Sequence, residues 1–181
     1  KGSERRLAFI RGDLNATREN PAAYKKHVLP VIKKGDAYTW FHHGLLDVAT
    51  GEHNADPNFK EPTFEALYEE MWLTAPSGDF YDAYKLVKSW RDALQKAFWV
   101  NKGNPNKEKL VNALDKMIKD PESVAAIEKK VGKYEWRTGA EGDNAVKTLK
   151  SFITPEALQT LADFKSKQLG YNTVYKEDLT K

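Results

Sequence analysis

The chain has 181 residues, 40% of them hydrophobic and 12% aromatic, which is enough for one or two domains with a sizeable core. Its 29 Lys and Arg residues nearly balance its 26 Asp and Glu residues, so nucleic acid is not the default partner. The absence of cysteine excludes a disulfide scaffold and a thiolate metal site, and no apolar run approaches the roughly 18 residues that span a bilayer. The first residue is Lys1 rather than methionine, so we expect a processed protein or a fragment.

The N-terminal part of the chain is predicted to alternate helices with short extended segments. Gly12 and Gly35 are expected to end the first two helices, because glycine readily takes the left-handed backbone that follows a helix. Pro30 lies inside the second helix and predicts a kink or a break there. In chain order, we expect the tail of a helix over residues 3–10, a strand or strand-to-loop segment over 13–17, a helix over 21–35, an aromatic strand over 37–41 and a loop over 44–61.

The rest of the chain is predicted to be mainly helical, with apolar residues at helical spacing. The expected helices run from Phe64 to about Met71, from about Phe80 to Leu94, over 110–118, from Pro121 to Gly132, over 143–153 and over 155–169 with Thr154 as N-cap. The longest is expected to bury one face, formed by Phe80, Ala83, Tyr84, Val87, Trp90 and Leu94. Residues 97–100 are predicted as a buried strand and 134–136 as a short strand. Strands separated by helices indicate an α/β architecture with helix in excess.

No arrangement of residues in the sequence indicates catalysis or metal binding. His42 and His43, with a third histidine at position 53, are possible metal ligands, but adjacent residues of a strand point to opposite faces. We expect ordinary surface or cleft histidines, one of which faces a ligand. The nearest paired carboxylates lie on predicted helix faces that are usually solvated, and no nucleophilic serine motif, Walker loop or dinucleotide motif occurs. We therefore expect no enzyme activity and no cofactor.

The most informative segment is DPNFKEPTFE, residues 56–65. Its Asp-Pro pair favours a turn, Pro62 disfavours helix at Glu61, and Thr63 is a suitable N-cap for a helix with Glu65 in its first turn. The segment resembles the DP-x-F-x-x-x-PTF-x-E signature of the tripartite tricarboxylate transporter receptors. These Bug-type receptors are periplasmic solute-binding proteins.

The resemblance covers nearly the whole chain, through RLAFIRGDLNAT, NPAAYKKHVLPVIKKGDAYTWFHHG, PSGDFYDAYK and AFWVNKGNPNKEKLVNALDKMIKDPESVAAIEKKVG. It implies part of a helix-rich, two-lobe α/β fold of the type II periplasmic-binding-protein kind. Residues 1–36 would end lobe two, 37–59 would form the interlobe crossing, and 60–181 would form the C-terminal part of lobe one. The first strands of lobe one would then lie in a missing N-terminal segment or a companion chain.

The implied function is the capture of a small organic acid in the periplasm and its delivery to membrane permease subunits, without nucleic acid. A carboxylate can be held by N–H groups, hydroxyls and ordered waters without a lysine or arginine. Two alternatives remain open: a helical or α–β interaction domain, and the cytoplasmic effector-binding domain of a transcription regulator.

The ligand is predicted to lie near two segments with polar side chains at expected strand ends, where α/β clefts form. Asparagine and threonine would donate hydrogen bonds to the carboxylate, an aromatic ring would cover the apolar part, and the aspartate would act through water or a ligand hydroxyl. The alternative is that these residues form only turns and core. The predicted ligand-binding residues are Asp13, Asn15, Thr17, Trp40, Phe41 and His42.

Overall fold

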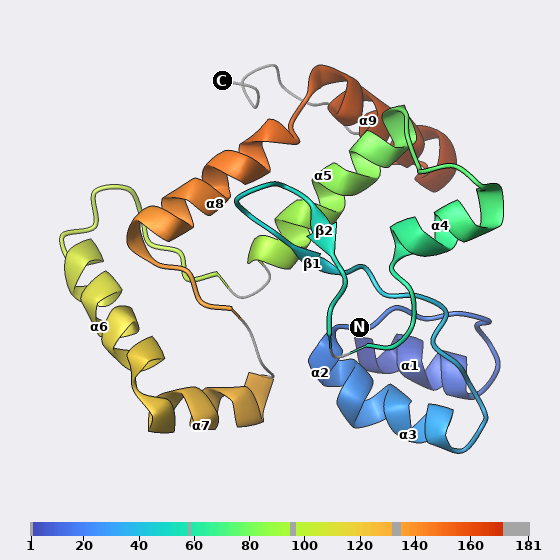
Figure 1. The fold of residues 1–181 in the computed structure, drawn as a ribbon, viewed down its shortest axis with the longest axis horizontal. Helices are drawn as coiled ribbons and strands as arrows, with labels where there is room; N and C mark the ends of the chain where they lie inside the picture. The colour runs from blue at the N-terminus through green and yellow to red at the C-terminus, as the bar shows by residue number, and fades with distance from the viewer. Residues whose placement is uncertain (1, 58, 95–96, 132–134, 172–181) are drawn as a thin grey trace. The chain divides into compact units, whose positions relative to one another are not determined.

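The computed structural model describes residues 2–57, 59–94, 97–131 and 135–171, and this part of the chain is rich in helix, as expected (Figure 1). The chain divides into two compact units. Unit 1 joins residues 1–39 to 116–136, and unit 2 joins residues 40–115 to 137–181. The sequence predicted lobe boundaries after residues 36 and 59, and these stay predictions. The resemblance assigned residues 116–136 to the lobe that contains residues 60–115, and that lobe assignment stays a prediction.

Unit 1 begins with helix α1, Gly2–Ile10, which ends as its sequence predicts. Gly12 has a φ of 82° and donates its N–H to the Phe9 carbonyl at 3.0 Å, while the next N–H, of Asp13, reaches the Ala8 carbonyl at 2.8 Å. This pair of bonds is a Schellman motif, which satisfies carbonyls left open at a helix end. After a loop, helical structure resumes at Pro21.

Pro30 is accommodated by a change of helix type. The helical run consists of α2, Pro21–Ala23, the π-helical segment η1, Tyr24–Val28, and α3, Leu29–Lys33. Leu29 donates its N–H to the carbonyl of Tyr24, five residues back, so the wide π turn takes the place of the α turn that the proline ring would crowd. Pro30 then occupies the first turn of α3, where its missing N–H costs little. The predicted kink is therefore a π segment.

Unit 2 holds the apolar core of the described chain. Its elements are β1, Leu45–Leu46, β2, His53–Asn54, α4, Phe64–Trp72, α5, Asp79–Leu94, α8, Gly139–Ser151, and α9, Pro155–Leu169. Helix α5 packs against α9, α8 and β1. The buried core residues include Leu86 on α5, Leu149 on α8 and Ala157 on α9. The Trp90 indole donates to the Leu149 carbonyl at 3.0 Å, which ties α5 to α8. Helix α6, Lys107–Lys119, runs from unit 2 into unit 1, which also contains α7, Pro121–Val131.

The predicted buried face of α5 is only partly correct. Ala83 is buried, but Phe80 and Val87 are exposed, whereas Leu86, Lys88 and Ser89 are buried. Helix α5 has neighbours on more than one side, namely α8, α9 and β1, so burial is not confined to a single stripe. The helix prediction itself is confirmed.

The predicted strands are wrong at residues 37–41 and 97–100, which lie in irregular backbone, and residues 13–17 form a loop. Phe98 and Trp99 are exposed rather than buried. In the described part of the chain, the only sheet is the antiparallel hairpin β1–β2, inside the predicted loop 44–61. A β-prone segment forms a strand only when a partner lies beside it, which sequence pattern does not reveal. Residue 134 lies outside the described residues, and 135–136 form no strand.

Gly44 is required by the hairpin. Its φ is 72°, and a Cβ atom there would lie 2.5 Å from the carbonyl oxygen of Asn54, closer than real Cβ contacts come. The turn closes through the N–H of Asp47, which donates to the Glu52 carbonyl at 2.8 Å. Two-residue strands are too short for alternation of apolar residues to predict, and this explains why the hairpin was missed.

The helix starts at Thr63 and Thr154 are confirmed. Each hydroxyl accepts a hydrogen bond of 3.1 Å from a backbone N–H three residues on, of Ala66 and Ala157 respectively. The helix expected over 143–153 begins earlier, at Gly139, and ends at Ser151.

Candidate functional site

The six predicted ligand residues fall in both units. Asp13, Asn15 and Thr17 belong to unit 1, and Trp40 to His42 belong to unit 2. In unit 1 the three residues lie on the loop after α1, where Asp13 pairs with Arg11 at 2.7 Å and Asn15 is exposed. Asp13 therefore has a local side-chain partner, and its predicted contact with a ligand stays a prediction.

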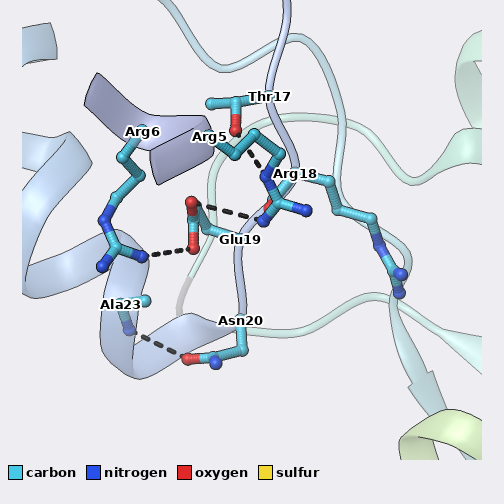
Figure 2. A network of polar contacts seen from close by, with 7 residues as sticks. All are labelled: Arg5, Arg6, Thr17, Arg18, Glu19, Asn20 and Ala23. Atoms are coloured by element: carbon cyan, nitrogen blue, oxygen red, sulfur yellow. Dashed lines mark hydrogen bonds and ion pairs between the residues drawn. The ribbon is translucent and has the colours of Figure 1, made fainter. Parts of the chain in front are cut away.

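Thr17 takes part in a polar network around Glu19, which Figure 2 shows in close-up. The Glu19 side chain is only 6% exposed, and its carboxylate accepts hydrogen bonds from Arg6 Nη1 at 3.0 Å and Arg5 Nη2 at 3.4 Å. Arg5 also donates through Nε to the Thr17 hydroxyl at 3.1 Å and through Nη2 to the Arg18 carbonyl. The network anchors the loop to α1, and Asn20 continues it by capping α2 through the N–H of Ala23 at 2.9 Å. The Thr17 hydroxyl is thus engaged in a structural contact.

In unit 2, Trp40, Phe41 and His42 belong to an aromatic cluster. The Phe41 ring lies 5.7 Å from the ring of Trp40 and 5.7 Å from that of Phe64, measured between centroids. His42 stacks on Phe59 at 5.2 Å with an interplanar angle of 21°. Trp40 is exposed and His42 is buried.

The segment 56–64 is held directly against His42. The N–H of His42 donates to the Pro62 carbonyl at 3.0 Å, and the N–H of Phe64 donates to the His42 carbonyl at 2.9 Å. These two bonds form an isolated parallel bridge between His42 and Thr63. The motif that carries the family resemblance and three of the predicted ligand residues are therefore parts of one local structure.

His42 is neutral at pH 7 and carries its proton on Nε2. Its Nδ1 accepts a hydrogen bond from the N–H of Gly44 at 2.9 Å, which leaves Nε2 as the protonated nitrogen of the neutral ring. Burial lowers the pKa of His42, and the negative charges of Asp56 and Glu61 oppose this shift. His42 can therefore act as a neutral hydrogen-bond donor.

A second histidine, His53 on β2, is held neutral more strongly. Burial lowers its pKa to about 4, and the positive charges of Lys88 and Lys85 add to the effect. Its Nε2 lies 3.3 Å from the hydroxyl of Ser89 on α5. This contact joins the hairpin to the helix.

Lys88 is the most unusual group in unit 2, and the sequence analysis missed it. The residue is 3% exposed, and neither its Nζ nor the Glu65 Oε2 has a hydrogen-bond partner in the described structure. Burial lowers the pKa of Lys88 to about 8, although the charges of Glu65 and Asp92 favour its protonated form. No sequence pattern marks this lysine, because charged residues on a helix are normally expected on its solvated side.

A buried lysine of lowered pKa can serve as a base or nucleophile, but a substrate must also reach it. Two open grooves, of about 590 and 350 Å³, are lined by other parts of unit 2 and by neither Lys88 nor His42. Among the described residues, no group of three His, Asp or Glu side chains could hold a metal ion.

No helix in the described part of the chain is long and apolar enough to cross a membrane. Comparison with known proteins finds no matching family model, no matching curated sequence and no matching solved structure.

Proposed function

We propose that this chain binds a small organic acid without transforming it, as part of a periplasmic receptor of the tripartite tricarboxylate transporter type. The proposal rests on the contact between His42 and segment 56–64, in which backbone bonds of 3.0 and 2.9 Å join the receptor-like motif to predicted ligand residues. The motif and the ligand residues were identified from different stretches of sequence, so their contact supports a common role.

The acid is proposed to bind through unit 2, beside Trp40 and His42. The Nε2–H of neutral His42 would donate to the carboxylate, a charge-assisted bond that needs no lysine or arginine. The exposed ring of Trp40 would cover the apolar part of the ligand. Asn15 belongs to unit 1 and stays a prediction from the sequence.

The same proposal includes the fold type, the compartment and the partners. The chain would contribute part of a two-lobe, type II periplasmic-binding-protein-like fold, and membrane permease subunits would receive the acid. Lobe closure would couple ligand capture to recognition by the permease. No cofactor is needed, because the ligand leaves unchanged.

The experiment is calorimetric titration of the full-length protein with small mono-, di- and tricarboxylates. One of them is expected to bind. Trp40→Ala should weaken the affinity for this acid about 10-fold or more, because the apolar part of the ligand loses its cover. Trp99→Ala is the matched control, because Trp99 is also an exposed tryptophan of unit 2, and it should leave the affinity unchanged. Absence of binding at millimolar concentration, or equal affinities for the two variants, would contradict the proposal.

A second candidate function is a helical interaction domain. The observation that favours it is a group of exposed large apolar side chains at the end of α4 and the start of α5, including Trp72, Leu73 and Phe80. Monomeric proteins rarely leave such groups uncovered unless they meet a partner.

A further inference from the structure

The apolar surface at the junction of α4, α5 and α9 has the features of a docking site. We call it the junction surface and define it by Met71, Trp72, Leu73, Phe80 and Phe164, all of which are exposed. Leu73 is 91% exposed and Phe80 is 72% exposed. Trp72 is the residue type most enriched among side chains that dominate binding energy at protein interfaces. All five belong to unit 2 and none belongs to the proposed acid-binding site.

The backbone of Leu73 provides independent evidence. Its φ of 56° and ψ of 25° place it in the left-handed region, and it alone among the described non-glycine residues has a positive φ. Its N–H donates to the Glu69 carbonyl at 2.8 Å, so it occupies the helix-ending position where glycine is usually found. A leucine there costs backbone strain and gains no burial within the chain. Contact of its side chain with a partner would offset that cost.

An open groove of about 590 Å³ adjoins these side chains. It lies between the start of α5, which contributes Phe80, and the second half of α9, which contributes Phe164. The groove also includes Ser77, only four residues after Leu73, so the chain keeps the two within about 15 Å. Its volume suits a few large side chains of a partner rather than a whole domain.

The charges around the junction surface are mainly negative. Glu69, Glu70 and Asp79 are exposed and form no ion pair in the described structure, while Lys167 is already paired with Asp163 at 3.2 Å. A second copy of the chain would bring like charges together, and so would an anionic membrane. The complementary partner is apolar in its centre and basic at its edges.

We propose that the junction surface binds an amphipathic helix of another protein, with leucine-like anchors that enter the Phe80–Phe164 groove and lysine or arginine residues that face Glu69, Glu70 and Asp79. This is recognition of a helix in a groove, in which anchors at i, i+3, i+4 and i+7 supply the apolar contacts. Trp72 and Leu73 would pack beside the helix as anchors from this chain.

The probe is a synthetic amphipathic peptide of about 18 residues that contains only leucine and lysine at helical spacing. Calorimetry with the full chain should give a dissociation constant in the micromolar range. A peptide with glutamate in place of lysine should not bind, and a leucine–lysine peptide of scrambled spacing should bind at least about 10-fold more weakly.

Two variants and one control test where the peptide binds. Leu73→Gly should raise the Tm by about 2 °C, because glycine relieves the strain of the left-handed backbone. The same variant should weaken the affinity for the peptide about 10-fold. Phe80→Ser should weaken it similarly. Phe98→Ser is the control. Phe98 is 68% exposed and follows the C-terminal end of the 16-residue helix α5, whereas Phe80 lies at its start, so this variant should leave the affinity for the peptide unchanged.

Three results would overturn the proposal: equal binding of the lysine and glutamate peptides, equal affinities of all three variants, or a lower Tm for Leu73→Gly with no loss of affinity. Sedimentation of the free chain as a dimer that Phe80→Ser dissociates would assign the surface to a second copy instead. Binding to vesicles of anionic lipid that Leu73→Gly abolishes would assign it to a membrane. These outcomes do not depend on whether an organic acid binds, so the two proposals can fail separately.

Discussion

Units 1 and 2 are stabilised in different ways. In unit 1, none of the residues 2–39, 116–130 and 135–136 is buried as a whole, and the enclosed Glu19 carboxylate lies between two arginines. In unit 2, Leu149 is 0% exposed beneath α5, and even the lysine at position 88 is buried. Charged contacts give geometric specificity but little net stability, whereas buried apolar surface contributes about 25 cal/mol per Å². We therefore expect unit 2 to be the more stable of the two.

Removal of packing from unit 2 should have the largest effect. Leu149→Ala is expected to lower the free energy of unfolding by about 2–5 kcal/mol, because it removes transfer energy and leaves a cavity. Urea denaturation followed by circular dichroism measures the change. Leu45→Ala, at an exposed position of β1, is the control and should cost less than about 1 kcal/mol. Equal losses for the two variants would mean that unit 2 has no packed core at Leu149.

Acid should weaken unit 2 through His53. The folded pKa is about 4 and the ordinary value is 6.5, so between these pH values the unfolded state binds more protons than the folded state. The stability of unit 2 should therefore fall as the pH decreases from about 6.5 to 4, by roughly 2 kcal/mol after allowance for the partial exposure of the ring. Denaturation midpoints across this range measure the loss.

Two histidine variants separate this effect from general acid sensitivity. His53→Gln should remove most of the slope between pH 6.5 and 4, while His27→Gln, at an exposed position of unit 1, should leave it unchanged. A slope that survives His53→Gln would show that other groups carry the acid response.

These two predictions use contacts that the sequence did not reveal. Thr63, Thr154 and Gly12 were identified correctly because caps and helix ends depend on residues within one turn. Strands at 37–41 and 97–100 were predicted wrongly because strand formation needs a partner segment, which is a non-local condition.

The candidate site shows the same limit. Trp40, Phe41 and His42 were singled out from composition and expected loop position, and their contact with segment 56–64 became visible only in the structure. The burial of Lys88 could not be predicted, because charged residues on a helix are normally assigned to its solvated side. The Thr17 hydroxyl accepts from Arg5, and its predicted contact with a ligand stays a prediction.

Removal of the Glu19 carboxylate should loosen unit 1 by a moderate amount. Glu19→Gln leaves Arg5 and Arg6 without their charged acceptor, and we expect a loss of about 1–2 kcal/mol, because both guanidinium groups keep some access to water. Hydrogen exchange of the amides in residues 13–20 should accelerate about 10-fold. Asp13→Asn, in the exposed pair with Arg11, is the control and should change little. A faster exchange in unit 2 rather than in unit 1 would argue against this anchor.

The smallest effects come from the same kind of bond in the two units, and they test the comparison most directly. Asn20 in unit 1 and Thr154 in unit 2 each cap a helix by accepting from a backbone N–H three residues on, at 2.9 and 3.1 Å. Each change to alanine should cost about 1 kcal/mol. If unit 2 is the more stable, Thr154→Ala should lower the hydrogen-exchange protection of the slowest amides of α9. Asn20→Ala should then affect only amides that already exchange readily. Equal effects of both variants on the slowest amides would show that the two units unfold together. The units would then differ in the kind of contact that holds them but not in their free energy of unfolding.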